Sequence, residues 1–278
     1  MVTINDLSFS YGANPVLKNI SMELLPGRIY GLLGENGVGK TTLLTLLCGL
    51  KKPQAGSIDI SGFKPSDRKP EMLSDIYYLS DEVMEISMKP MEFAQNYGKF
   101  WNNFSMETFS QMLTIFEVPV DNRMDRMSAG QLKKTHISFA LACACRLILM
   151  DEPTNGLDIP SKAQFRKALL QFTSEDSTVV ISTHQVKDLE NVIDPVIILD
   201  RQDVLLNASI SEISEKVYFD YGTEINPSAL YSEIIPGGCI QVLPNADGRD
   251  SKVNIEALFN AVHKNKDWFK ACFTTPKN

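Results

Sequence analysis

The 278-residue sequence lacks any apolar run long enough to cross a bilayer. Its most apolar stretch, residues 137–150, is interrupted by Arg146 and is shorter than the roughly 20 residues that a spanning helix needs. The start of the chain also lacks the basic segment and apolar core of a secretion signal. We therefore expect a cytoplasmic protein, and a role at a membrane would require another chain to supply the pore.

An excess of positive charge is also missing. Lys and Arg number 27 against 34 Asp and Glu, which gives a formal net charge of −7. This balance argues against a nucleic-acid binder, so we expect no specific nucleic-acid partner. Two short basic pairs, Lys51-Lys52 and Lys133-Lys134, are interpreted as solvated faces. The sequence contains no repeat of solenoid period and no low-complexity tract.

Cysteine and histidine are both sparse. The five cysteines form an odd set without the spacing of a disulfide framework. Cys143 and Cys145 have the spacing of a metal pair, but they lie in an apolar stretch, which favours buried thiols. Of the three histidines, only His184 stands in a motif, whereas His136 and His263 lie in helical segments without one.

The octet GENGVGKT at residues 34–41 fits the P-loop pattern G-x-x-x-x-G-K-[ST]. It follows an apolar strand predicted at residues 28–33 and precedes a helix predicted at 42–48. Glycines let backbone N–H groups surround phosphates, and the helix N-terminus adds a positive dipole end. Lys40 can then reach the outer phosphates and Thr41 can ligate Mg2+. The alternative is a glycine-rich turn, which the strand and the helix disfavour.

A second motif begins with four apolar residues at 147–150, which predict a strand buried on both faces. Pro153 ends that strand, so Asp151 and Glu152 emerge at its carboxyl end, where ligands bind in open α/β sheets. One carboxylate can hold Mg2+, and the other can take a proton from water attacking a γ-phosphate. Without the P-loop, the same pattern would fit an ordinary polar turn.

Residues 127–131 (MSAGQ) precede a helical stretch predicted at 132–146. Ser128 is a favourable N-cap, and the free N–H groups of the first turn beside Ala129 and Gly130 make a second anion site. One P-loop suffices to bind ATP, so a second phosphate-binding helix end suggests ATP held between two subunits. The alternative is an ordinary helix cap.

In this order, the motifs resemble those of the nucleotide-binding subunit of an ABC transporter. That family has a P-loop, a signature (usually LSGGQ), a Walker B strand, a D-loop and a switch histidine. Residues 127–131 match the signature with Met for Leu and Ala for the first Gly, and residues 155–158 match the D-loop. His184 follows the apolar strand 178–182 and matches the switch. The resemblance covers residues 1 to about 210.

The resemblance implies a set of nucleotide-binding residues. Tyr11 is expected to stack on adenine. The residues expected to bind the triphosphate and Mg2+ are Gly34, Asn36, Gly37, Gly39, Lys40, Thr41 and Thr42.

The resemblance also implies roles in catalysis and pairing. Asp151 would orient the metal through water, Glu152 would be the general base, and Lys40 and His184 would complete the catalytic set. His184 would contact the γ-phosphate and the attacking water. The residues expected to meet the partner subunit are Ser128, Gly130 and Gln131, which would close over its ATP, and Asp158, which would help join the two sites.

One position departs from the family pattern. Where the family usually has a Gln after a short strand, residues 75–82 read DIYYLSDE, with Asp81 at the Gln position. Asp81 could ligate Mg2+ as a hard oxygen donor, but it would repel phosphate in the absence of the metal. A shifted alignment and a true substitution both remain open.

The expected fold class is α/β, with a P-loop NTPase core and an antiparallel β layer built from residues 1–30 and 56–62. An inserted helical subdomain, rich in Met and aromatic residues, is expected at about 82–145. Beyond His184 we expect a helix at 186–192, strands at 196–199 and 204–206, and a helix at 255–262. An ABC ATPase domain would span residues 1–210 and a small C-terminal α/β extension residues 211–278.

The expected function is ATP hydrolysis that powers a separate integral membrane permease, of the exporter type. Two ATPase subunits, either identical or closely related, would close around ATP and Mg2+ at the inner face of the membrane. A soluble ABC ATPase acting in DNA repair or translation is the alternative. Such proteins usually carry two ATPase units, a long coiled coil or zinc cysteines, and this sequence has none. A P-loop kinase would not explain residues 128–131 or His184.

Overall fold

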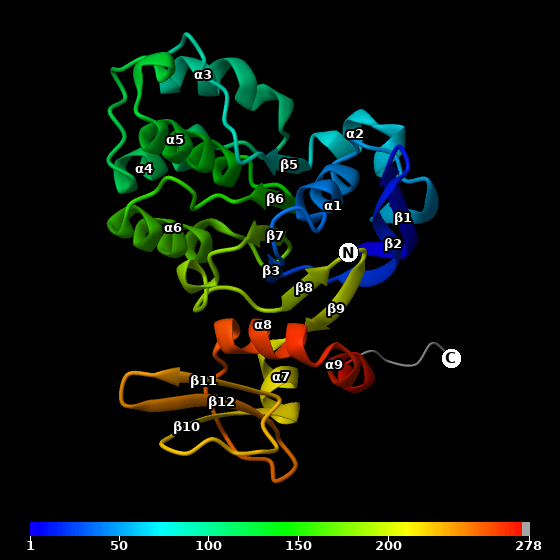
Figure 1. Cartoon of the computed structure of the whole chain (residues 1–278). Coiled ribbons are helices and arrows are strands. Elements are labelled where there is room, and N and C mark those ends of the chain that lie inside the picture. Colours follow the sequence, from blue (N-terminus) through cyan, green and yellow to red (C-terminus); the bar gives the residue numbers. More distant parts are fainter. Residues whose placement is uncertain (274–278) are drawn as a thin grey trace.

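The computed structural model describes residues 1–273 and arranges them around three β-sheets (Figure 1). A six-stranded sheet forms the centre, a three-stranded antiparallel sheet flanks one side, and a second small sheet belongs to the C-terminal part. Helices α3 to α6 lie on the side away from the first antiparallel sheet. The predicted α/β fold, a P-loop core with an antiparallel layer, is confirmed.

The central sheet has the strand order β5-β6-β7-β3-β8-β9. Neighbouring strands from β5 to β8 are parallel, and β9 pairs antiparallel with β8 at the edge. The strands are nearly continuous apolar runs, as expected for a sheet covered on both faces. Their bounds are β5 (Ile76–Leu79), β6 (Leu147–Asp151), β7 (Thr178–Thr183), β3 (Arg28–Leu33), β8 (Val196–Asp200) and β9 (Asp203–Ala208).

The antiparallel layer has the strand order β2-β1-β4 and was predicted from alternating apolar residues. Its strands are β1 (Val2–Tyr11), β2 (Asn14–Leu24) and β4 (Ala55–Ile60). Helix α1 (Lys40–Leu47) shares an apolar core with this layer and with one face of the central sheet. The core fixes the start of α1 between the two sheets, where the P-loop is.

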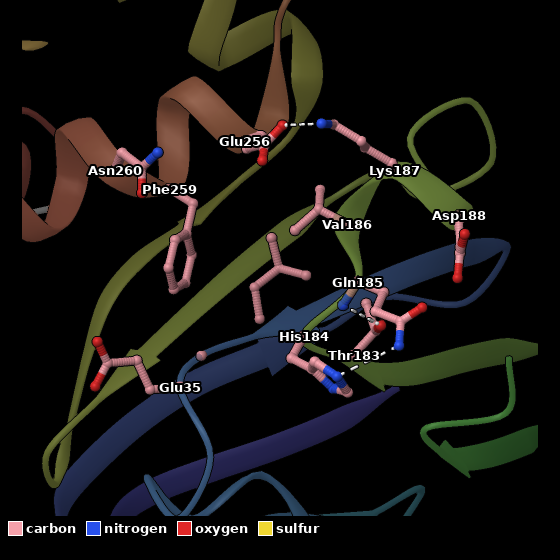
Figure 2. Close-up of a pocket in the computed structure, with 12 residues that line it drawn as sticks. Glu35, Thr183, His184, Gln185, Val186, Lys187, Asp188, Glu256, Phe259 and Asn260 are labelled. Carbon is pink, nitrogen blue, oxygen red and sulfur yellow. Dashed lines mark hydrogen bonds and ion pairs between the residues drawn. The ribbon is translucent and has the colours of Figure 1, made fainter. Parts of the chain in front are cut away.

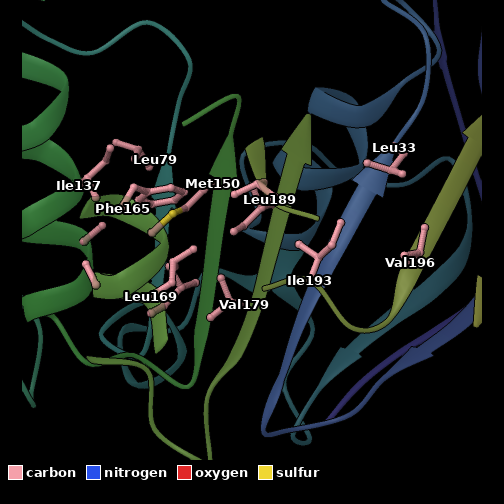
Figure 3. Close-up of a cluster of buried hydrophobic side chains, with 14 of the residues drawn as sticks. Leu33, Leu79, Ile137, Met150, Phe165, Leu169, Val179, Leu189, Ile193 and Val196 are labelled. Atoms are coloured by element: carbon pink, nitrogen blue, oxygen red, sulfur yellow. The ribbon is translucent and has the colours of Figure 1, made fainter. Parts of the chain in front are cut away.

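The opposite face of the central sheet is covered by helices. Its core includes Leu33 and Met150 from the sheet, Ile137 from α5, and Phe165 and Leu169 from α6 (Figure 3). The helices on this side are α3 (Pro90–Tyr97), α4 (Met106–Ile115), α5 (Ala129–Ala142) and α6 (Ile159–Phe172). Shorter turns connect them and the neighbouring segments: η1 (Pro65–Asp67), α2 (Pro70–Leu73), η2 (Gly98–Phe100) and η3 (Met124–Arg126).

Two helix predictions were wrong in extent. Helix α5 begins at Ala129 and ends at Ala142, short of the predicted Arg146, because Ala144 takes a left-handed φ of 46° that cannot continue a helix. The helix predicted at 186–192 is only a single 3-10 turn, η4 (Val186–Asp188). There Arg166 donates to the carbonyl of Asp188 at 2.9 Å, so a side chain supplies the bond that a longer helix would have made.

Up to residue 273, the C-terminal part forms the third sheet, with the order β10-β12-β11, and the helices α7, α8 and α9. The predicted helix at 255–262 is confirmed as α8, and the predicted division near residue 210 stays a prediction. Lys266 and Lys270 of α9 form ion pairs with Asp200 and Asp203 at the β8–β9 turn. The elements are α7 (Ile210–Lys216), β10 (Val217–Gly222), β11 (Tyr231–Ile235), β12 (Gly238–Pro244), α8 (Ile255–Lys264) and α9 (Lys266–Phe273).

Within residues 1–273, none of the helices has the length and apolar character needed to cross a membrane. The same residues contain no group of three or more His, Cys, Asp or Glu side chains that could hold a metal ion by themselves. Cys143 and Cys145 are free and buried, and burial raises the pKa of both thiols. The interpretation of these two residues as buried thiols is confirmed.

Candidate nucleotide site

The P-loop joins β3 to α1 and lines one wall of a cavity of about 390 Å3. Gly37 and Gly39 have positive φ values of 82° and 112°, which glycine adopts without strain. A Cβ at Gly39 would approach Val16 Cγ1 to 2.8 Å, so the loop also needs the small residue there. The cavity is lined by Tyr11, Val16, Asn36, Gly37, Gly39, Lys40, Thr41, Thr42, Asp81, Asp151 and Glu152.

Lys40 is buried at the base of this cavity. Its Nζ donates to the carbonyls of Gly34 at 2.7 Å and Glu35 at 3.2 Å and lies 3.9 Å from Glu152 Oε1. Burial lowers the pKa of Lys40, while the carboxylates of Glu152 and Asp151 act in the opposite direction. The lysine therefore braces the P-loop from inside and places a positive charge at the cavity base.

Asp151 and Thr41 come together as the sequence predicted. Thr41 Oγ1 donates to Asp151 Oδ2 at 2.6 Å, and Ser182 donates to the other carboxylate oxygen. Tyr78 donates to Asp151 at 3.5 Å, and burial, then the nearby carboxylate, raise the pKa of Tyr78. The hydroxyl and carboxylate are hard oxygen donors, the kind that fits Mg2+ when phosphate and water oxygens complete the shell.

Glu152 follows β6 and is 8% exposed. Its φ of 44° is unusual for a residue with a side chain, and its N–H is fixed by the carbonyl and hydroxyl oxygens of Ser182 at 3.1 and 3.2 Å. Its carboxylate lies 2.9 Å from His184 Nδ1. The strained backbone thus aims a buried carboxylate at the cavity that Lys40 lines.

His184 reaches Glu152 but lines a different cavity, of about 520 Å3 (Figure 2). That cavity lies between the P-loop residue Glu35, residues 183–188 and helix α8, from which Phe259 and Asn260 contribute. Sequence reasoning missed it because the P-loop and α8 are more than two hundred positions apart. The C-terminal part therefore borders the predicted switch histidine.

Tyr11 stands at the mouth of the nucleotide cavity. Its side chain is 47% exposed, and its hydroxyl is 3.3 Å from Thr42 Oγ1. Phe9 packs edge-to-face against it, and Lys51 Nζ lies 4.8 Å from the centre of its ring. The expected adenine-stacking residue is therefore beside the predicted phosphate-binding residues.

Asp81 lines the same cavity, but its closest partners belong to other segments. Lys133 of α5 forms an ion pair with it at 3.2 Å, and the Asn155 amide donates to both carboxylate oxygens at 3.3 and 3.4 Å. Lys133 is 4% exposed, so its interpretation as part of a solvated face was wrong. Nothing in the sequence linked positions 81 and 133, because the contact arises only from the fold.

The predicted signature lies outside the cavity of its own chain. Ser128 accepts from the N–H of Gln131 at 3.3 Å, and Gln131 Oε1 accepts from the N–H of Ser128 at 3.0 Å, a capping box for α5. Ser128 is exposed and Gly130 is half-buried. None of these three residues lines the nucleotide cavity. This part of the protein can therefore face another molecule.

Asp158 caps α6, and its carboxylate accepts from the N–H of Ser161 at 2.9 Å. Hydrogen bonds from Ser161 hold the pKa of Asp158 below its ordinary value. The side chain is exposed and outside the nucleotide cavity, so its contribution to a second subunit stays a prediction.

Comparisons with known proteins agree with this geometry. The family model described as "ABC transporter" matches residues 17–155. A putative ABC transporter ATP-binding protein of Synechocystis is 31% identical over 223 residues, which cover 76% of each chain. The lantibiotic transport ATP-binding protein SrtF of Streptococcus pyogenes is 30% identical over 207 residues, 70% of this chain and 84% of SrtF.

A solved dimer of the ABC transporter cassette MJ0796 has a similar fold. The TM-score is 0.66 at 22% identity, and the match covers 75% of this chain and 98% of that cassette. The family model, the relatives and the shared fold all point the same way. The chain belongs to the ABC transporter family, as an ABC-type ATPase and ATP-binding subunit.

Proposed function

We propose that this chain hydrolyses ATP in the cavity between the P-loop and β6 and thereby powers a separate integral membrane permease. The observation that carries the proposal is the convergence of Lys40, Thr41, Asp151 and Glu152 on one cavity. SrtF bears the name of a transport protein, which supports transport as the task. The chain would work at the inner face of the membrane, held there by the permease.

Binding would rest on the P-loop. The residues proposed to hold the triphosphate are Gly34, Asn36, Gly37, Gly39, Lys40, Thr41 and Thr42, with Tyr11 against the adenine. Thr41 and Asp151 would hold Mg2+, and Asp81 lines the same cavity. Mg2+ bound there supplies positive charge beside the phosphate oxygens. The buried Lys40 ammonium adds to it at short range.

Glu152 is the proposed general base. Its carboxylate lines the cavity and is oriented by His184 Nδ1 at 2.9 Å, while Lys40 Nζ lies 3.9 Å away. These contacts fix the carboxylate where it can accept a proton from a water molecule beside the γ-phosphate. His184 would orient Glu152 through this contact, and its expected contact with the γ-phosphate and the attacking water stays a prediction.

A second subunit completes the site in this proposal. Ser128, Gly130 and Gln131 are accessible and lie away from the cavity of their own chain, so another subunit would bring them over its ATP. Two cavities would then be closed by two signature ends, with Asp158 near the junction. Helix N–H groups at these ends would face phosphate oxygens.

The test is ATP-dependent dimerisation. Glu152→Gln with ATP and Mg2+ should elute as a dimer on sizing, and the same protein without nucleotide as a monomer. A monomer at every nucleotide concentration would contradict the two-subunit site. Purification from membranes should recover an integral membrane protein with the chain. Recovery of ribosomes or DNA in its place would favour the soluble alternative.

A further inference from the structure

A continuous series of polar side chains runs from helix α5 to the proposed general base. It begins at Lys133, whose Nζ donates to Asp81 Oδ1 at 3.2 Å and also to the Asp81 carbonyl. Asn155 Nδ2 donates to the same carboxylate at 3.3 and 3.4 Å. Three segments that are distant in sequence thus meet at one carboxylate.

The series continues through Gln185. Its Nε2 donates to Asn155 Oδ1 at 3.3 Å and lies 3.4 Å from His184 Nε2, and His184 Nδ1 lies 2.9 Å from Glu152 (Figure 2 shows the Gln185–His184 contact). Lys162 donates to Gln185 Oε1 at 3.1 Å, which fixes the orientation of the amide.

The directions of these bonds are mutually consistent. Asn155 Nδ2 donates to the Asp81 carboxylate, so its Oδ1 is left to accept from Gln185 Nε2, and the same Gln185 nitrogen faces His184 Nε2. His184 Nε2 must then accept, which leaves the ring proton on Nδ1, where it can donate to Glu152. The series therefore selects one tautomer of His184 as well as its orientation.

The first link joins a buried lysine to an aspartate whose side chain is 46% exposed. The Lys133 ammonium is almost fully removed from water, and a buried charge left without its partner is costly. The position of Asp81 is therefore tied to the position of α5, the helix whose first residues form the exposed signature. A shift of α5 would therefore displace Asp81 and change the hydrogen bonds of Asn155 and Gln185.

We propose that Asp81, Asn155 and Gln185 are positioning residues that hold His184 in the tautomer and orientation needed to align Glu152, and that Lys133 ties them to the signature helix. The inference rests on the proposed roles of Glu152 and His184. It gives Asp81 a task as a junction between α5 and the catalytic residues, in addition to any contact with Mg2+.

The first test measures the tautomer of His184 by NMR in the full chain without nucleotide. With 15N-labelled histidine, the three imidazoles are assigned by removing them one at a time. Gln185→Leu should shift the His184 ring nitrogens and mix its tautomers, with His136 and His263 unchanged. Gln111→Leu, which removes an exposed amide on α4, is the matched control. Unchanged His184 signals in Gln185→Leu would overturn the proposal.

The second test asks whether the two ends act through one route. Lys133 and Gln185 lie at opposite ends of the series. Lys133→Met and Gln185→Leu should each lower kcat about tenfold and leave KM for ATP within about twofold of wild type. In a connected series, kcat of the double variant should be about tenfold below wild type, no lower than in either single variant, because one substitution already breaks the series. A product of the two losses, about a hundredfold, would overturn the proposal. Lys134→Met is the control for loss of a neighbouring lysine.

The two proposals can fail separately. Full turnover in Glu152→Gln and His184→Ala would end the proposed catalytic roles, and the nitrogen signals would still decide whether Gln185 sets the tautomer of His184. Loss of turnover in those variants with unchanged His184 signals in Gln185→Leu would end only this inference. Thermal unfolding of each variant identifies loss caused by misfolding.

Discussion

The two helix ends proposed to meet phosphate are built in different ways. Helix α1 begins behind Gly39, which has a left-handed backbone and no side-chain cap, and its first turn is mostly buried against the cavity. Helix α5 follows the exposed Ser128, whose capping box with Gln131 pairs the N–H groups of these two residues. The first end leaves its amides to a ligand, whereas the second is stable without one. Under the proposed function, one subunit would bind nucleotide by itself and a second subunit would close the site.

The largest expected effect concerns Glu152, which lines the cavity at the start of α1. Glu152→Gln should keep ATP affinity and reduce turnover about a thousandfold, because the amide cannot accept the proton while its shape is retained. Phosphate release and ATP titration measure the two quantities. Glu71→Gln, on exposed α2, serves as the control. Turnover close to wild type would exclude Glu152 as the base.

Ser128→Asp tests whether the start of α5 meets phosphate. Asp is a good N-cap, so the helix should remain stable, but its negative charge would face the phosphate of a partner subunit. We expect turnover to fall about a hundredfold with ATP affinity of the isolated chain within about twofold. Ser105→Asp, which makes the same change at the cap of α4, should have little effect. Equal turnover in both variants would show that Ser128 meets no phosphate.

Lys40→Ala tests the buried charge of the α1 end. Loss of a charged donor should weaken ATP binding roughly 10- to 100-fold, in line with about 1.5–3 kcal/mol for hydrogen bonds to charged groups. Titration with a fluorescent ATP analogue gives the affinity. Lys18→Ala, an exposed lysine on β2, is the control. Unchanged affinity would mean that Lys40 only braces the loop.

The smallest expected effect concerns His136, which is buried on α5 and contacts the carbonyl of Met84 at 3.0 Å. Burial lowers its pKa, so the unfolded chain takes up a proton near pH 6.5 that the folded chain resists. The stability that the neutral imidazole contributes at pH 7 is therefore lost progressively as the pH falls through and below 6.5.

His136→Gln keeps a donor toward Met84 but cannot titrate in this range. Its free energy of unfolding in urea should change less between pH 7.5 and 5.5 than that of the wild type. An identical pH dependence in the two proteins would place the titrating group elsewhere.

Local signals made much of this site predictable. The strand before Gly34, the strand before Asp151 and the cap at Ser128 each depend on a few adjacent residues, and all three were found from sequence. The contact between Lys133 and Asp81 spans 52 positions and depends on how α5 packs, so no local pattern could reveal it. The helix predicted after His184 was too long, and there too a distant residue contributes, because Arg166 of α6 donates to the carbonyl of Asp188.

A single apolar interior extends from Leu33, at the end of the strand that carries the P-loop, to Phe269 in the last described helix. Truncation of the chain after β9 would therefore expose an apolar surface on the ATPase part, and the truncated protein should aggregate. A truncated ATPase without this C-terminal quarter should therefore carry polar substitutions on the surface that truncation exposes.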